Sequence, residues 1–216
     1  EKAMEKGLIS YGEFNPNMTF VYTTYANILE AEGKYDESIA LLEKNLKIRT
    51  ATYGELHRWT CETYYDLANA YVLVKNYDKA EKYYKKAIEI GKKINSRQYL
   101  ANARNFLAQL YIDREIHLDE SERLLKVSLD TNIDIYGYKS DLIAENYLQL
   151  AAVNKLKGDE SLFLEYIKKS LEAANYNQDD LGTVIGPLQA VDALMLISEW
   201  YNESYEKDHK IEHLID

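Results

Sequence analysis

The stretch YYDLANAYVLVKNYDKAEKYYKKAIEI, residues 64–90, decides the fold. Its first half repeats apolar and small residues at spacings of three and four, which is typical of a helix that buries one stripe. The residues of this stripe are Tyr64, Leu67, Ala68 and Tyr71. A second stripe follows the polar turn at 76–78 and consists of Ala80, Tyr83, Tyr84, Ala87 and Ile88. Residues 64–90 are therefore predicted to form a helical hairpin.

Outward from this hairpin, the dipeptide Tyr-Gly recurs at a regular step. It stands at 11–12, 53–54 and 136–137, so the separations are 42 residues and then 83, about two more steps. A fixed period in this range indicates a stacked helical array rather than one globular core. Function is therefore expected on a surface that several repeats share, and not in a single catalytic pocket.

The hairpin pattern predicts one continuous all-α domain over 1–216, because a solenoid grows by adding repeats and has no separate cores to count. The predicted parts are the end of a preceding repeat at 1–15, four repeats at 16–57, 58–98, 99–140 and 141–182, and a C-terminal capping helix at 183–216. The chain opens with charged, helix-favouring residues and no initiator methionine. We therefore expect an excised segment of a longer protein.

Turn residues and small residues support this division. Gly33 is predicted to adopt a positive φ at a helix end, and Asp36 to cap the helix that follows. His57 and His117 are assigned to inter-helix turns as capping residues. Where the two helices of a hairpin approach closely, the aligned residues are small, namely Ala26, Ala68, Ala108 and Ala151.

The order of leucine or tyrosine, alanine and tyrosine, then a Gly-Lys-Tyr-Asp type of turn, then alanine, tyrosine and alanine resembles the tetratricopeptide repeat. The resemblance is best over 64–90 and extends to about Ala174. The 42-residue step, with Tyr-Gly followed three residues later by His57, resembles the longer repeats of kinesin light chains. The resemblance implies a right-handed α-solenoid of about four hairpins with a partial N-terminal helix, whose first helices line an inner groove.

In such repeats the residue after the aligned alanine faces the groove, which implies Asn27, Asn69 and Gln109 as a row of amide side chains. Amides donate and accept hydrogen bonds at once, which suits gripping the main chain of a peptide or helix. Solvated amides without a ligand are an equally simple explanation. The further predicted groove residues are Tyr65, Asp66, Asn102, Asn105, Phe106 and Gln149. Tyr65 and Phe106 are candidate anchors, although aromatic residues in helix stripes serve packing more often than binding.

Charge narrows the class of partner. Asp66 would repel a carboxylate, so the predicted partner is a protein or peptide that is not acidic in the groove, and the carboxylate tails of heat-shock proteins are disfavoured. Residues 1–108 carry 16 basic and 14 acidic side chains, whereas residues 109–216 carry 10 and 22. The acidic half would repel nucleic-acid phosphates. No stretch approaches the roughly 18 apolar residues of a membrane span. We therefore expect a cytoplasmic protein that binds neither nucleic acid nor a membrane.

Other chemistry is considered and set aside. The lysines between Lys79 and Lys93 alternate with glutamates, which favours a solvated face over a docking patch. The single cysteine, Cys61, has no partner for a disulfide or a cysteine-based metal site. His209 and His213 lack a third ligand, and the sequence has no phosphate loop or nucleophile elbow. No enzyme, metal or cofactor is predicted.

Three functions remain open. The first is a scaffold or adaptor that binds a peptide or helix in the inner groove. The second is a regulatory or sensor segment that controls an effector domain, either an enzyme or a DNA-binding domain, of a larger protein. The third is self-association through the exposed end at residues 1–12, where a preceding helix would pack.

Overall fold

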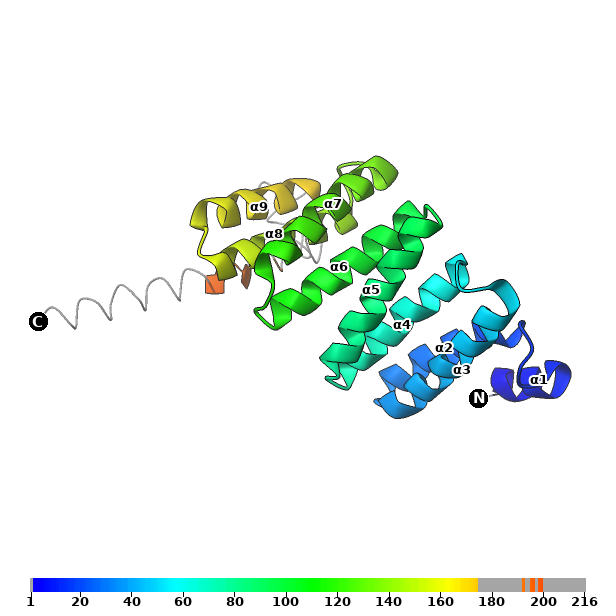
Figure 1. The fold of residues 1–216 in the computed structure, drawn as a ribbon. Helices are drawn as coiled ribbons and strands as arrows, with labels where there is room; N and C mark the ends of the chain where they lie inside the picture. Colours follow the sequence, from blue (N-terminus) through cyan, green and yellow to red (C-terminus); the bar gives the residue numbers. More distant parts are fainter. Residues whose placement is uncertain (1, 175–191, 193–194, 197, 200–216) are drawn as a thin grey trace, which may run out of the picture. The chain divides into compact units, whose positions relative to one another are not determined.

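The computed structural model describes residues 2–174, 192, 195–196 and 198–199. This part of the chain is all-α and contains no strand (Figure 1). Its helices are α1 (Lys2–Tyr11), α2 (Met18–Ala31), α3 (Tyr35–Tyr53), α4 (Arg58–Leu73), α5 (Tyr77–Lys93), α6 (Arg97–Asp113), α7 (Leu118–Tyr136), α8 (Asp141–Lys157) and α9 (Glu160–Ala173). The predicted C-terminal capping helix at 183–216 lies outside the continuous part of these residues.

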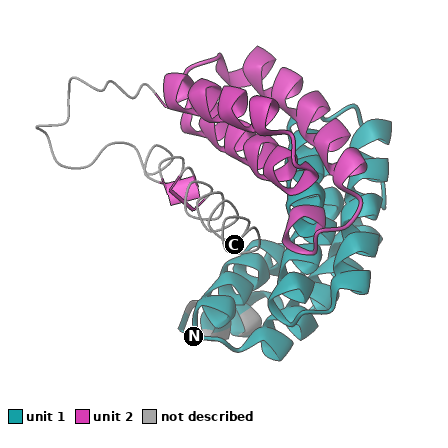
Figure 2. Ribbon diagram, turned by 90° about the vertical axis from the view of Figure 1, so that its left-hand side faces the viewer, with its two compact units in different colours: residues 1–110 teal, residues 111–216 magenta. Residues whose placement is uncertain are grey.

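The chain divides into two compact units, residues 1–110 and residues 111–216, and α6 runs across the division (Figure 2). In unit 1, α1 packs on α2, and each of α2, α3 and α4 packs on the helix that follows it. In unit 2, α8 packs on both α7 and α9. The sequence prediction of an all-α solenoid fold built from helical hairpins, with a helix before the first hairpin, is confirmed.

The cores of both units contain the predicted stripes. Leu67, Ala68, Tyr71, Ala80 and Tyr84 are buried in the hairpin of α4 and α5. The small residues expected at close helix contacts are buried as well, namely Ala26, Ala68, Ala108 and Ala151. Gly91 adds a contact that the repeat pattern does not predict, because a Cβ at this position would lie 3.4 Å from Cα of Leu100 on α6.

The turns inside the hairpins share a left-handed residue. Gly33 has a φ of 76° and Gly158 has a φ of 76°, as glycine readily allows. Lys75 has a φ of 57° between α4 and α5, and Glu115 has a φ of 52° between α6 and α7. A side-chain-bearing residue therefore takes the glycine position in two of these turns, at a cost in backbone strain.

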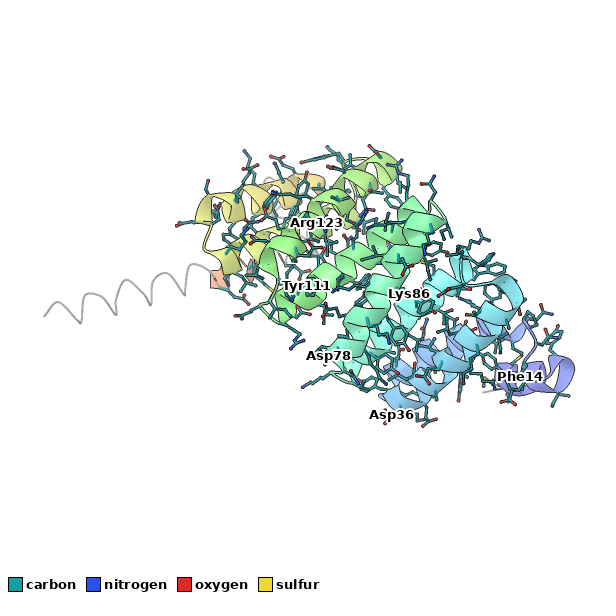
Figure 3. All side chains as sticks on the ribbon, viewed as in Figure 1. Phe14, Asp36, Asp78, Lys86, Tyr111 and Arg123 are labelled. Atoms are coloured by element: carbon teal, nitrogen blue, oxygen red, sulfur yellow. The ribbon has the colours of Figure 1, made fainter. Side chains whose placement is uncertain are left out.

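Helix capping departs from the prediction in two places. Lys34 is the N-cap residue of α3, so Asp36 lies within the first turn of that helix and makes no cap. Asp36 and Asp78 stand at the starts of α3 and α5, the second helices of their hairpins (Figure 3). His117 is the N-cap residue of α7, but its side chain makes no capping hydrogen bond. His57 does cap α4, since its side chain accepts from the Trp59 backbone N–H.

Candidate protein-binding face

The first helices of the hairpins in unit 1 carry their polar and aromatic groups at matched positions. The side chains at i, i+3, i+4 and i+7 of a helix lie on one face. On α4 these are Glu62, Tyr65, Asp66 and Asn69, on α6 they are Asn102, Asn105, Phe106 and Gln109, and on α2 they are Phe20, Thr23, Thr24 and Asn27. We call these three sets together the first-helix face.

Two aromatic groups stand at the surface of this face. Phe106 has 40% of its surface exposed and meets the ring of Tyr65 edge-on, with centroids 5.1 Å apart. The ring of Tyr84 lies behind both, 6.4 Å from Phe106 and 6.3 Å from Tyr65. Phe20 is 53% exposed and makes an edge contact with Trp59 at 5.4 Å. Neither Phe20 nor Trp59 is predicted as a groove residue from the sequence, because both lie apart from the positions next to the aligned alanines.

The predicted amide residues occupy different environments. Asn27 is exposed, whereas Asn69, Asn102 and Gln109 are half-buried. The Tyr84 hydroxyl donates to Oδ1 of Asn69 at 2.5 Å, which fixes the orientation of that amide. Asn105 is only 6% exposed, so its side chain belongs to the interior of the face rather than to its surface.

Arg49, on the second helix α3, lies beneath the first-helix face and is 1% exposed. Its Nη1 donates to the Trp59 carbonyl at 2.8 Å, to Oε2 of Glu62 at 2.9 Å and to the Thr63 hydroxyl at 3.0 Å. Its Nη2 lies 3.4 Å from the Thr23 hydroxyl on α2. A buried guanidinium is tolerated only when it is paired and hydrogen-bonded, and these contacts join α3 to both α2 and α4.

Asp66 lies one helical turn after Glu62 on α4. The residue is half-buried, and its Oδ2 atom is completely buried and accepts no hydrogen bond from any described residue. Burial raises the pKa of the Asp66 carboxyl to about 7, and the negative charges of Glu62 and Glu30 act in the same direction while Arg49 opposes them. At neutral pH this carboxyl is therefore divided between its neutral and charged forms.

Gln149 is the one predicted contact that belongs to unit 2. It is half-buried on α8, and its Oε1 lies 3.5 Å from Nδ2 of Asn146. Oδ1 of Asn146 in turn accepts from Nδ2 of Asn132 on α7 at 2.8 Å. Gln149 thus belongs to a chain of amide groups that joins α7 to α8.

The other groups weighed in the sequence have structural explanations. Cys61 is buried, its thiol lies 3.3 Å from the Ala87 carbonyl, and burial raises its pKa to about 11, so it is a poor nucleophile. Lysines of α5 pair with acidic neighbours, for example Lys86 with Glu55 at 2.8 Å and Lys93 with Glu89 at 2.6 Å.

The described part of the chain contains neither a metal-binding cluster nor a membrane-spanning helix. No group of three or more histidine, cysteine, aspartate or glutamate side chains there could hold a metal ion. Within the same residues, no helix has the length and apolar character that crossing a membrane requires. His209 and His213 lie outside the described residues.

Comparison with known proteins finds a family model that matches part of the chain. Residues 18–93 match the model of the tetratricopeptide repeat. No curated protein matches the chain. The fold is similar to that of BtubC (BKLC) from P. vanneervenii, with a TM-score of 0.71 and 19% sequence identity over 85% of this chain and 74% of that chain.

Two further solved structures extend the likeness. A putative kinesin light chain from Podosopora anserina with nearly identical TPR-like repeats has a TM-score of 0.73 and 15% identity, over 90% of this chain and 90% of that chain. Aspartyl phosphate phosphatase F from Bacillus subtilis has a TM-score of 0.71 and 11% identity, over 93% of this chain and 53% of that chain. Residues 18–93 thus match the tetratricopeptide repeat, and the chain has the α-solenoid fold of tetratricopeptide-repeat proteins, similar to kinesin-light-chain-like repeats.

Proposed function

We propose that the chain is a protein-interaction module and that the first-helix face of unit 1 binds an extended or helical segment of a partner protein. The observation that carries this proposal is the matched register of α2, α4 and α6, which sets amide, carboxylate and aromatic side chains side by side on three helices. Repeat proteins of this architecture commonly bind partners along such a surface.

The chemistry of the face supports binding. Exposed aromatic side chains are frequent anchors of interfaces, and Phe20 and Phe106 supply one at each side of the face. Asn27, Asn69 and Gln109 place amide groups among them, which suits the main chain of a bound segment. In this role the described residues bind a partner and do not catalyse a reaction.

The test is a quantitative affinity capture from the extract of the source cells, using the full chain, a Phe106→Ala variant and a Leu164→Ala variant. Leu164 is a matched control, because it is 39% exposed on α9 and Phe106 is 40% exposed on α6. We expect at least one partner to be lost with Phe106→Ala and kept with Leu164→Ala. Equal recovery by all three chains would move the binding surface away from the first-helix face.

A second candidate is a regulatory segment that controls an effector domain in a longer protein. One observation favours it, namely that this chain spans only 53% of aspartyl phosphate phosphatase F, so a longer chain can contain this fold. Sequencing the gene around this segment tests the candidate. An adjoining catalytic or DNA-binding domain would support it, and flanks that contain only further repeats would remove it.

A further inference from the structure

The first-helix face contains a carboxyl group with an unpaired oxygen atom. Oδ2 of Asp66 is buried and receives no hydrogen bond from any residue that the structure describes. Leaving a buried acceptor unsatisfied destabilises the folded protein, and more so when the group is charged. Such a group in a folded protein calls for an explanation, and a ligand that supplies the missing donor is one.

The protein's own nearest cation does not supply that donor. Arg49 lowers the pKa of Asp66 through its charge, yet its Nη1 donates to the Trp59 carbonyl, Glu62 and Thr63 at 2.8–3.0 Å. Glu62 therefore takes the ion pair with Arg49, at 2.9 Å, and Asp66 does not. The guanidinium is 1% exposed and held from α2 and α4, so turning it toward Asp66 would break these bonds.

The surroundings of Asp66 favour a positive charge. Glu62 lies on the same helix and Glu30 on α2, and the negative charge of each acts on Asp66. Glu30 accepts a hydrogen bond from a neutral donor, the Ser38 hydroxyl, at 2.7 Å. Two negative charges and one positive charge thus act on Asp66, and the positive one, Arg49, is paired with Glu62.

We infer that Asp66 receives the cationic group of a basic side chain, lysine or arginine, in the bound partner segment, an inference that rests on the proposed function. Lysine and arginine combine an apolar stem with a charged head. The stem or its apolar neighbours can lie on the rings of Tyr65 and Phe106, while the head pairs with Asp66. A free peptide amino terminus offers the same ammonium chemistry.

The test uses synthetic peptide pools and the full chain. Each pool consists of acetylated, amidated decapeptides of mixed small, polar and apolar residues, with one central position fixed as arginine, lysine, glutamine or glutamate. An additional glutamine pool has a free amino terminus. Affinities are measured by fluorescence anisotropy at pH 6 and pH 8 for the wild type, Asp66→Asn, Phe106→Ala and the control Glu37→Gln, which changes an exposed acid of α3.

The expected result is a preference for the arginine and lysine pools over the glutamine pool that Asp66→Asn removes and Glu37→Gln retains. The preference should also grow with pH. With a pKa of about 7, roughly a tenth of Asp66 is ionised at pH 6 and nine tenths at pH 8, so the affinity of the basic pools should rise by up to about tenfold. Asp66→Asn should abolish this rise.

Other outcomes separate this inference from the proposed function. A basic preference that persists in Asp66→Asn overturns the role of Asp66, and a preference for the glutamate pool overturns the basic partner. If all pools bind equally and Phe106→Ala weakens their binding, the preference for a basic group is overturned but the proposed binding face is kept. Binding of no pool overturns both. Tighter binding of the glutamine pool with a free amino terminus than of the acetylated glutamine pool supports the role of Asp66 and identifies the amino terminus as the cation.

Discussion

Arg49 shows how a single residue can join three helices. Its guanidinium is buried and bonded to groups on α2 and α4, although the residue itself belongs to α3. A neutral, smaller side chain would leave a cavity and several polar groups without their donor. Polar groups of both α2 and α4 therefore depend on Arg49 for a hydrogen-bond donor.

Arg49→Ala should lower the free energy of unfolding by roughly 2–4 kcal/mol, from the cavity and the unpaired acceptors. Urea unfolding followed by circular dichroism measures this change. Arg123→Ala is the matched control, since Arg123 is exposed and pairs with Glu120 of its own helix, and it should cost less than about 1 kcal/mol. Similar losses for the two variants would contradict the role given to Arg49.

Asp66 makes the stability of the protein depend on pH in an unusual direction. Its pKa is raised to about 7 in the folded protein from an ordinary value of 3.8, so the folded chain holds a proton that the unfolded chain has already released between these values. Stability contributed by this group is therefore complete below about pH 4, falls as the pH rises toward 7, and stays low above it.

Asp66→Asn should consequently be more stable than the wild type at pH 8, by roughly 1–3 kcal/mol, and no more stable at pH 4. Thermal and urea unfolding at both pH values provide the measurement, with Glu37→Gln as the control variant. A gain in stability together with weaker binding of the basic peptides is the result expected for a binding residue. If the variant were less stable at pH 8, the carboxylate would have an internal partner.

Lys75 adopts a left-handed conformation that costs about 1 kcal/mol for a residue with a Cβ. Lys75→Gly should therefore stabilise the turn between α4 and α5 by roughly 0.5–1 kcal/mol, after allowing for the greater freedom of glycine in the unfolded chain. Lys82→Gly, at an exposed helical position of α5, should instead destabilise by about 1 kcal/mol. Melting temperatures of the two variants that moved in the same direction would contradict this account.

Among helices, the contact between α5 and α6 depends on the missing side chain of Gly91. A Cβ there would already touch Leu100, at 3.4 Å from its Cα and its Cβ. Gly91→Leu should separate the helices and cost about 1–3 kcal/mol. The exposed neighbour Lys92→Leu should change stability by less than about 0.5 kcal/mol. Thermal unfolding of both variants measures the difference, and an unaffected Gly91→Leu would show that α6 can move aside.

The helices themselves could be predicted from the sequence because each buries a stripe with a period near 3.6. The stripes at Leu67, Ala68 and Tyr71 fix the hairpin, and the Tyr-Gly step places its copies. The turns were harder to predict from the sequence. Glycine signals the left-handed turn at Gly33 and Gly158, but Lys75 and Glu115 adopt it without any signal in the sequence.

The candidate site could be predicted only in part. The spacing of residues along a helix decides which side chains share a face. Tyr65, Asp66 and Phe106 could therefore be placed on the first-helix face from the sequence. Burial within that face depends on neighbouring helices, so the sequence could not separate buried Asn105 from half-buried Asn102. The partners of Arg49 lie 10–14 residues away on the next helix and 26 residues away on α2, and no local pattern indicates them.

At the scale of the whole molecule, charge is divided unevenly along the chain. Residues 1–108 carry 16 basic and 14 acidic side chains, and residues 109–216 carry 10 and 22. Unit 1 is therefore nearly neutral and unit 2 is strongly acidic. Repulsion among like charges destabilises a folded unit, and salt weakens this repulsion.

Raising the salt concentration from about 50 mM to 500 mM should therefore stabilise unit 2 more than unit 1. Hydrogen exchange measured by mass spectrometry resolves the two, with peptides from α8 and α9 expected to gain more protection than peptides from α4 and α5. An equal gain in both would indicate a general effect of salt on apolar burial.

Arg49, Gly91 and Asn132 stand at the same place in successive second helices, 42 and then 41 residues apart. Each meets the following first helix differently: Arg49 through its guanidinium, Gly91 through its bare backbone against Leu100, and Asn132 through a hydrogen bond that its side-chain amide donates to Asn146. If the hairpins arose by duplication, they have since diverged at their junctions. An arginine opposite α6 or a glycine opposite α4 would lack its match. The hairpins are therefore not interchangeable, because each junction requires its own matched pair of residues. These pairs determine the order of the hairpins along the chain.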